Sequence, residues 1–229
     1  MSNKANVELI IFDMAGTTVY DGDAVHNCLS NAIRELGLEV TRDEVNRVMG
    51  IAKPIAIRDL LTSRVPLEQM DNAVEGGYAL FLDFMLSHYR TSPEVREVEG
   101  AAEVFRQLHA RGVKVALDTG FSRPIADAVL ERLGWLRDGL VDFTVTTDEV
   151  AAGRPAPDMA LRAMELAGVL DPSRVAKVGD TPVDLLEGTA AKCGWVIGVT
   201  EGSHTADELS GYPHTNLVSS VRDIPAVVL

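Results

Sequence analysis

The sequence predicts an α/β fold: a Rossmann-like core built on a parallel sheet, with an all-helical cap domain inserted into it. Runs rich in Val and Ile recur along the 229 residues, with helix-length segments between most of them, which is typical of a parallel sheet covered by helices. About a hundred residues separate the first run from the second, too many for one crossover, and the stretch from 24 to 90 has an almost entirely helical pattern. We therefore expect a cap domain at 21–94 and a core made of 1–20 and 95–229.

Each core element has its own local signal. The predicted strands are 7–12, 113–117, 141–146, 175–178 and 195–199. Ser122 with Pro124 can open a helix that Gly134 closes, and Pro157 and Gly168 bracket a second helix, because proline suits the first turn and glycine the residue after the last.

The cap is predicted to contain four helical segments. They cover 24–36, the region from 41 to 49, 54–61 and 66–90. Thr41 and Glu44 have the spacing of a capping box, and the pair Gly76-Gly77 weakens the long last segment. In that segment Tyr78, Phe81, Phe84 and Met85 form a stripe at helical spacing, which predicts cap core or a dimer contact.

Charge and cysteine content exclude several functions. With 34 acidic and 21 basic residues the formal charge is −13, which argues against nucleic acid or an anionic membrane as a partner. A small anionic substrate would then need locally placed cations. Cys28 and Cys193 lie far apart, so neither a disulfide framework nor a zinc site is indicated. The apolar run at 9–12 is too short for a signal peptide or a membrane span, and we expect a cytoplasmic protein.

Polar residues follow four of the predicted strands. They are Asp13, Thr119-Gly120, Gly153-Arg154-Pro155, and Gly179-Asp180 with Asp184. Open parallel sheets bind ligands at the carboxyl ends of their strands, so these groups should converge. Taken singly, Asp13 could be a turn residue, Thr119 a helix cap, Arg154 a solvated loop charge, and both later acids first-turn residues favoured by the helix dipole.

In this order, the four groups resemble the motifs of the haloacid dehalogenase superfamily of phosphoryl-transfer enzymes. The resemblance implies that Asp13 is the nucleophile and that Asp13, Asp180 and the carbonyl of Ala15 bind Mg²⁺, since this ion prefers hard oxygen ligands. It also implies that Thr119, with Gly16 and Gly120, holds the transferring group. Arg154 would balance its charge, and Asp184 would orient Arg154 or a bound water.

Ala15 narrows the resemblance to one branch. The superfamily usually has a second, acid–base Asp at this position. The motif Asp-x-Ala-Gly-Thr-Thr, and Arg rather than Lys at position 154, resemble the corresponding motifs of the phosphonoacetaldehyde hydrolases (phosphonatases) and their relatives. These enzymes break a carbon–phosphorus bond. A leaving group that needs protonation by the missing Asp fits poorly.

The segment from Met49 and Gly50 to Leu60 resembles the phosphonatase motif around a Schiff-base lysine, which here is Lys53. An iminium at that lysine would accept the electron pair of the breaking bond, so departure would need no proton. Pro54 suits the first helical position, which would make Lys53 the N-cap. The positive helix end, Arg58 and burial would then lower its pKa. Without the motif, a surface lysine before proline is the ordinary interpretation.

Three positions depart from the phosphonatase pattern and leave the substrate open. Ala56 stands where a His is expected, Phe121 where an aromatic hydroxyl is expected, and Asp23 where a Cys is expected. The implied substrate is phosphonoacetaldehyde or a substituted 2-oxoalkylphosphonate, with a homodimer also possible. The alternatives are a phosphomonoesterase or sugar-phosphate mutase on the same fold, and a catalytically silent phosphate-binding module. His204 is expected to cap a short helix rather than bind metal.

Overall fold

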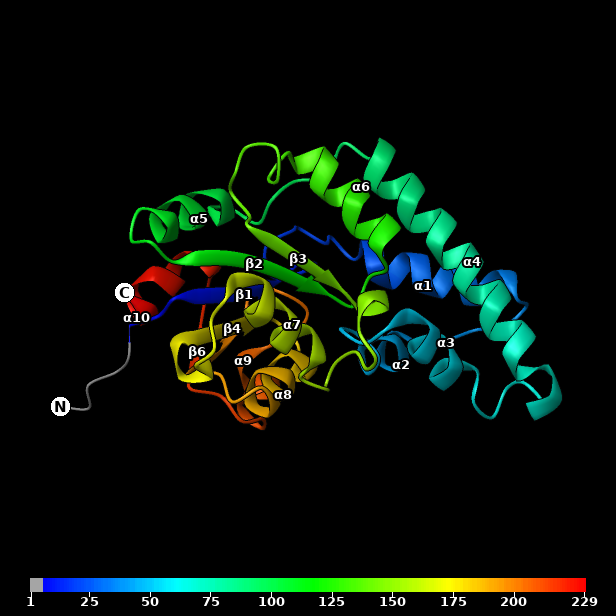
Figure 1. Cartoon of the computed structure of the whole chain (residues 1–229). Helices are drawn as coiled ribbons and strands as arrows, with labels where there is room; N and C mark the ends of the chain where they lie inside the picture. The colour runs from blue at the N-terminus through cyan, green and yellow to red at the C-terminus, as the bar shows by residue number, and fades with distance from the viewer. Residues whose placement is uncertain (1–5) are drawn as a thin grey trace.

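The computed structural model describes residues 6–229, and its core is a six-stranded parallel sheet (Figure 1). The strand order is β3-β2-β1-β4-β5-β6, and every neighbouring pair is parallel. The strands are β1 (Leu9–Asp13), β2 (Lys114–Thr119), β3 (Phe143–Thr146), β4 (Val175–Gly179), β5 (Trp195–Val199) and β6 (Asn216–Val218). The predicted α/β class and the five predicted strands are confirmed. β6 is an addition, because three residues with one polar member give too short a pattern to predict.

Strand β1 is buried on both faces, which explains why its sequence before Asp13 is an unbroken apolar run. Ile10 and Phe12 pack into the larger apolar cluster, and Leu9 and Ile11 into a second cluster on the opposite face. The ring of Phe12 meets that of Phe105 edge-on, with centroids 5.4 Å apart. The alternation leaves Asp13 at the carboxyl end of a strand that is fixed on both sides.

Helices cover both faces of the sheet (Figure 1). The core helices are α5 (Ala101–His109), α6 (Arg123–Leu133), α7 (Asp158–Ala167), α8 (Pro182–Ala190), α9 (Ala206–Ser210) and α10 (Ile224–Val228). Gly134 and Gly168 end α6 and α7 in the left-handed conformation, as predicted. The N-cap of α9 is Thr205 and not the predicted His204, because Thr205 forms a capping box with Glu208.

Four of the five helices between β1 and β2 lie beyond the carboxyl ends of the strands (Figure 1), and the fifth is the core helix α5. The four are α1 (Ala24–Glu35), α2 (Arg42–Asn46), α3 (Lys53–Leu61) and α4 (Leu67–Thr91). α4 packs against α1 and α3, and also against α6 of the core. The Thr41–Glu44 capping box is present at the start of α2. The boundaries that separate a cap domain from the core stay a prediction, and residues 1–5 of the expected core lie outside the described residues.

Two local predictions about the cap helices need correction or refinement. α3 begins at Lys53 with Ala52 as its N-cap, so Lys53 is the first helical residue and not the cap. The Gly76-Gly77 pair does not interrupt α4. A Cβ atom at Gly77 would lie 3.2 Å from side-chain atoms of both Ile57 and Leu36, so the small residue lets three helices approach closely. In the predicted stripe, Phe81 and Met85 are completely buried and belong to the core.

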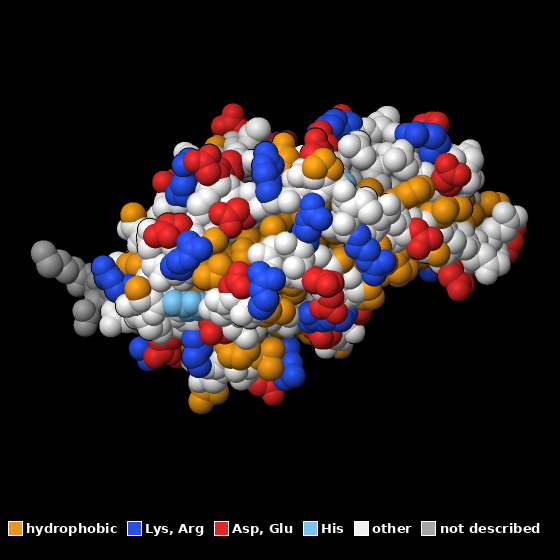
Figure 2. Space-filling model, turned by 90° about the horizontal axis from the view of Figure 1, so that it is seen from above, with side chains coloured by type: hydrophobic (Ala, Val, Ile, Leu, Met, Phe, Trp, Pro, Cys, Tyr) orange, Lys and Arg blue, Asp and Glu red, His pale blue; other side chains and the backbone are white. Residues whose placement is uncertain are grey.

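The surface has a mixed charge. On the face drawn in Figure 2, acidic and basic side chains alternate, with hydrophobic side chains between them. Cys28 and Cys193 are both free thiols. Within residues 6–229, none of the helices combines the length and apolar character needed to cross a bilayer.

The loop between α2 and α3 touches the core at backbone level. A Cβ atom on Gly120, just after β2, would lie 2.8 Å from the carbonyl oxygen of Gly50 and 3.0 Å from that of Ile51. Gly50 has a φ of +80°, and a Cβ atom there would lie 2.6 Å from the Thr181 hydroxyl. We call this contact between the loop and the core the seam. It needs glycine at both Gly50 and Gly120.

We predict that Gly120→Ala lifts this loop. Backbone oxygens cannot swing aside as a side chain does, so the loop must move away from the added methyl group. Amide hydrogen exchange at 49–53 should become at least about tenfold faster, since local opening needs less free energy. Gly211→Ala is the control, because Gly211 has a φ of −74° and the nearest atom to its Cβ would be 3.8 Å away. Unchanged protection of 49–53 in Gly120→Ala would show that the contact is unimportant.

Candidate active site

The strand order places the carboxyl ends of β2, β1 and β4 side by side, and polar groups meet there. Asp13 ends β1, Thr119 ends β2 and Asp180 follows β4. All three are buried. Thr119 is further fixed because its hydroxyl accepts a hydrogen bond from the Phe121 N–H at 3.1 Å. The structure thus brings together groups far apart in the chain.

Arg154 links these strand ends through four carboxylates. Its Nη1 lies 2.6 Å from Asp13 Oδ1 and 3.0 Å from Asp184 Oδ1. Its Nε donates to Glu187 at 3.1 Å, and Nη2 donates to Asp118. This contact places Asp184 beside the guanidinium of Arg154, where the family resemblance implied it would lie.

Lys177, Asp118 and Glu187 complete the buried cluster and were not among the predicted site residues. Lys177 Nζ pairs with Asp118, and lies 3.1 Å from Asp184 Oδ1 and from Glu187 Oε2. One signal was available in the sequence: Lys177 and Asp118 are charges inside otherwise apolar strands, and buried charges are almost always paired. The sequence does not predict which of these charges pair with each other, because the partners are far apart along the chain.

Burial makes the acids of this centre costly to ionise. Burial chiefly, with Asp184 and Asp180 nearby, raises the pKa of Asp13 to about 8, against the opposing effect of Arg154. Burial also raises the pKa of Glu187 to about 8. The buried set contains five carboxyl groups and three cations, an excess of two negative charges if all ionise. The acids are Asp13, Asp118, Asp180, Asp184 and Glu187; the cations are Lys53, Arg154 and Lys177.

Asp180 has the surroundings of a cation ligand. It is completely buried, and its contacts are hydroxyl and backbone N–H groups: Thr17 Oγ1 at 2.9 Å and Ser203 N and Oγ at 2.6 Å. Burial and the neighbouring Asp184 raise its pKa. A Cβ atom on Gly16 would lie 2.4 Å from Asp180 Oδ2, so the turn after β1 lies against this carboxylate. Carboxylates from the ends of β1 and β4, with backbone oxygens between them, are a donor set that fits a hard divalent cation.

Three of the acids lie close enough together to share a metal ion. Asp13, Asp118 and Asp184 have oxygens within 4.8 Å of one another. Arg154 and Lys177 already contact these oxygens, and their positive charge opposes a metal at the same point. Asp180 has no recorded ion pair with either cation within residues 6–229, so a metal held by Asp13 with Asp180 stays a prediction.

Lys53 is buried in the same cavity as Asp13. The cavity has a volume of about 20 Å³, and its lining includes Asp13, Lys53 and Arg154. Only 3% of Lys53 is exposed. Its Nζ donates to the carbonyl of Ile51 at 3.2 Å and lies 5.9 Å from the centre of the Phe121 ring. Within residues 6–229, the structure records no carboxylate in ion-pair distance of this amine.

Burial lowers the pKa of Lys53 to about 8, with a smaller contribution from Arg154, although Asp13 and Asp21 act in the opposite direction. A buried lysine without a paired carboxylate is a suitable nucleophilic amine. Of the other predicted residues, Ala15, Met49, Gly50, Thr119 and Gly120 also line this cavity, whereas Gly16 lines the neighbouring pocket.

Two of the three departures from the phosphonatase pattern lie at or near this cavity. Phe121 lines it beneath the lysine. Ala56 is completely buried, one turn along α3 from Lys53. Asp23 lies outside, paired with Arg42 on the wall of the neighbouring pocket.

Comparison with known proteins identifies the family. Residues 7–192 match the family model of the haloacid dehalogenase-like hydrolases. The chain is 34% identical over 211 residues to a phosphonoacetaldehyde hydrolase of Bacillus cereus, covering 86% of this chain and 77% of that one. It is 31% identical to a phosphonoacetaldehyde hydrolase of Bacteroides fragilis, covering 95% and 87%.

Solved structures share the fold. A phosphonoacetaldehyde hydrolase-like protein of Oleispira antarctica superposes with a TM-score of 0.84 at 24% identity, covering 98% of this chain and 92% of that one. A predicted phosphoglycolate phosphatase of Haemophilus somnus gives 0.81 at 17% identity, covering 98% and 99%. The chain therefore belongs to the haloacid dehalogenase-like hydrolases, and its sequence is similar to phosphonoacetaldehyde hydrolases.

Proposed function

We propose that this hydrolase cleaves the carbon–phosphorus bond of phosphonoacetaldehyde or a closely related 2-oxoalkylphosphonate, with Mg²⁺ as cofactor. The observation that carries the proposal is the amine of Lys53, buried without a carboxylate partner in the cavity that contains Asp13. Hydrolysis of a phosphate ester by Asp13 needs no nucleophilic amine. The cost of burying it is understandable if it reacts with a carbonyl group.

Lys53 solves the problem of the leaving group. A bare carbanion is too basic to depart, but a protonated imine (iminium) between Lys53 and a carbonyl carbon two atoms from phosphorus can accept the electron pair and become a neutral enamine. The enamine needs no proton as it leaves. This explains how Ala15 can occupy a position where an acid–base Asp serves other members of the superfamily.

Asp13 is the acceptor of the phosphoryl group. Its attack brings two anions together, a repulsion of about 4 kcal/mol per charge pair at 4 Å with an effective dielectric constant near 20. Arg154, held by three other carboxylates, lies 2.6 Å from Asp13 and can bind the incoming oxygens. Mg²⁺ held by Asp13, Asp180 and the Ala15 carbonyl would supply further positive charge.

The cycle ends with two hydrolytic steps. Water hydrolyses the aspartyl phosphate at Asp13 and releases phosphate. The enamine is protonated, and water then releases the aldehyde from Lys53. The closed seam at Gly50 and Gly120 limits the access of bulk water while the imine is intact.

A phosphomonoesterase is the second candidate, because the fold is shared with a predicted phosphoglycolate phosphatase. That likeness is one of fold alone. Ala15 argues against it, since an ester oxygen needs a proton as it leaves. Hydrolysis of p-nitrophenyl phosphate as efficient as phosphonoacetaldehyde cleavage, and unaffected by loss of Lys53, would favour this second function.

Lys53→Arg is the first test of the proposal. Arginine keeps the positive charge but cannot form the imine, so phosphonoacetaldehyde cleavage should fall by roughly 10⁴-fold or more. Cyanoborohydride with substrate should leave a covalent adduct on Lys53 of the wild type, located by peptide mass mapping. Lys192→Arg, at an exposed lysine, is the control and should keep both activity and adduct. An adduct on another lysine would overturn the assignment.

The lowered pKa of Lys53 predicts the pH dependence of trapping. Only the neutral amine attacks a carbonyl. With a pKa of about 8, about 10% is neutral at pH 7, against about 0.03% for an ordinary lysine. The initial rate of adduct formation should rise through pH 8 and then level off. A rate that keeps rising to pH 10 would mean that the amine is not buried in solution.

Asp13→Asn should separate the two chemical steps. The amide is nearly isosteric with the carboxylate but is not a competent nucleophile, so phosphate release should fall by roughly 10⁴-fold or more. Lys53 should still be trapped by cyanoborohydride with phosphonoacetaldehyde, because imine formation does not use Asp13. Phosphate release close to the wild-type rate would exclude Asp13 as the phosphoryl acceptor.

A further inference from the structure

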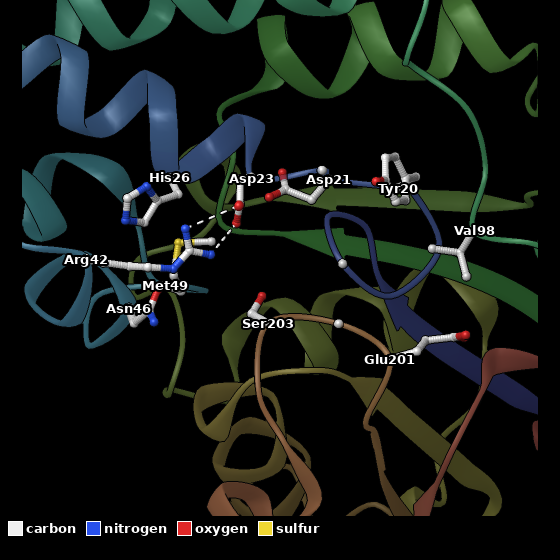
Figure 3. Close-up of a pocket in the computed structure, with 13 residues that line it drawn as sticks. Tyr20, Asp21, Asp23, His26, Arg42, Asn46, Met49, Val98, Glu201 and Ser203 are labelled. Carbon is white, nitrogen blue, oxygen red and sulfur yellow. Dashed lines mark hydrogen bonds and ion pairs between the residues drawn. The ribbon is translucent and has the colours of Figure 1, made fainter.

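A larger pocket lies directly beside the catalytic cavity, and nothing in the proposed reaction of phosphonoacetaldehyde uses it. Its volume is about 120 Å³. It lies between the turn after β1, the helices α1 and α2, and the loop at 201–203 (Figure 3). Met49 and Ser203 line both this outer pocket and the catalytic cavity, so the two spaces share a wall.

The catalytic cavity is much smaller than the outer pocket. Its volume is about 20 Å³, against about 120 Å³, so phosphonoacetaldehyde itself must displace part of the lining and leaves no further room there. With the phosphonate at Asp13 and the carbonyl carbon at Lys53, a substituent on that carbon must extend outward. The shared wall at Met49 and Ser203 leads into the outer pocket.

The outer pocket has an excess of acceptor groups. Asp23 is already paired with Arg42, whose two terminal nitrogens donate at 2.6 and 3.2 Å. Asp21 accepts one bond, from the Val25 N–H at 3.2 Å through Oδ1, and among the described residues its second oxygen has no recorded partner. Burial raises the pKa of Asp21 to about 6, so at neutral pH it is mainly a carboxylate.

His26 supplies a second incompletely paired group. Both of its ring nitrogens are shielded from solvent and lack a hydrogen-bond partner among the described residues. In Figure 3 the side chains of Asp21 and His26 project from the same stretch of chain on one side of the pocket. Asp21 can accept a hydrogen bond from a ligand as it stands, whereas His26 must first turn its ring to donate or accept one.

We propose that this pocket is a substrate subsite for a hydroxyl-bearing substituent on the carbonyl carbon, which would donate to Asp21. The inference rests on the proposed C–P cleavage and names its substrate class: 2-oxoalkylphosphonates with a hydroxymethyl group. A methyl group would leave the Asp21 carboxylate desolvated without a partner. A carboxylate would face Asp21 and Glu201, with Arg42 already paired to Asp23.

The test compares three ketones that differ only in this substituent. They are 3-hydroxy-2-oxopropylphosphonate, 2-oxopropylphosphonate and phosphonopyruvate, with phosphonoacetaldehyde as the reference. We expect kcat/KM for the hydroxymethyl ketone to exceed that for the methyl ketone by at least about tenfold. The methyl group cannot donate a hydrogen bond, so it would leave the Asp21 carboxylate unpaired. The carboxylate should be poorer than the hydroxymethyl ketone by a similar factor.

Asp21→Ala identifies the group responsible. In this variant the kcat/KM values for the hydroxymethyl and methyl ketones should differ by no more than about threefold. Asp21→Asn, which keeps an acceptor oxygen, should restore part of the preference for the hydroxymethyl ketone. Asp59→Ala, at an exposed position on α3, is the control and should keep the wild-type ratio. A preference that survives Asp21→Ala would overturn the assignment to Asp21. If that variant does not fold, Asp21→Leu, which is of similar size but has no acceptor oxygen, replaces it.

The outcomes separate the two proposals. Cleavage of phosphonoacetaldehyde with no preference for the hydroxymethyl ketone, or with no cleavage of either ketone, would overturn the subsite and leave the proposed function standing. Absence of cleavage for all four compounds, with no adduct on Lys53, would overturn both.

Discussion

The withdrawal of a dense set of charges from water at one edge of the sheet is the constraint on which the rest of the structure depends. Removing an ion from water costs several kcal/mol unless it is well paired. Arg154 and Lys177 meet this demand because each contacts several acids, and three of those acids are shared between them. The arrangement fixes the guanidinium from several directions. It still leaves an acidic excess around Asp13 and Asp180, which is consistent with the metal ion proposed there.

The helices α1 to α4 turn this charged edge into an enclosed site. They place the loop at 49–52 on Gly120, and α3 starts at the residue whose amine enters the cavity. Burial then changes the chemistry of that amine, since the same desolvation that makes acids harder to ionise makes a lysine easier to deprotonate. A lysine on the surface of the same helix would have the wrong protonation state for imine formation at neutral pH.

The positions that depart from the phosphonatase pattern have different physical consequences. Phe121 keeps an aromatic face beneath Lys53 and meets the ring of Tyr89 edge-on, with centroids 5.9 Å apart. Ala56 contributes a small apolar group to the cap core. Asp23 forms an ion pair with Arg42 that is half exposed to solvent, and such pairs contribute little to stability. Its charge instead changes the wall of the outer pocket, so the bond-breaking centre and the part that selects a substrate can vary separately.

The sequence by itself determined the elements whose signals are local. Buried parallel strands are continuous apolar runs, the Thr41–Glu44 spacing marks a helix start, and glycine ends α6 and α7. Asp13, Thr119 and Asp180 were predictable as a group because parallel strands bring their carboxyl ends to one edge. The tertiary structure alone decided which charges pair: Arg154 reaches Asp13 across 141 positions and Asp118 across 36. It also decided that Lys53 is buried, that α3 begins one residue earlier than the proline suggests, and that a three-residue β6 completes the sheet. These outcomes depend on contacts between distant segments, and local periodicity and capping carry no information about such contacts.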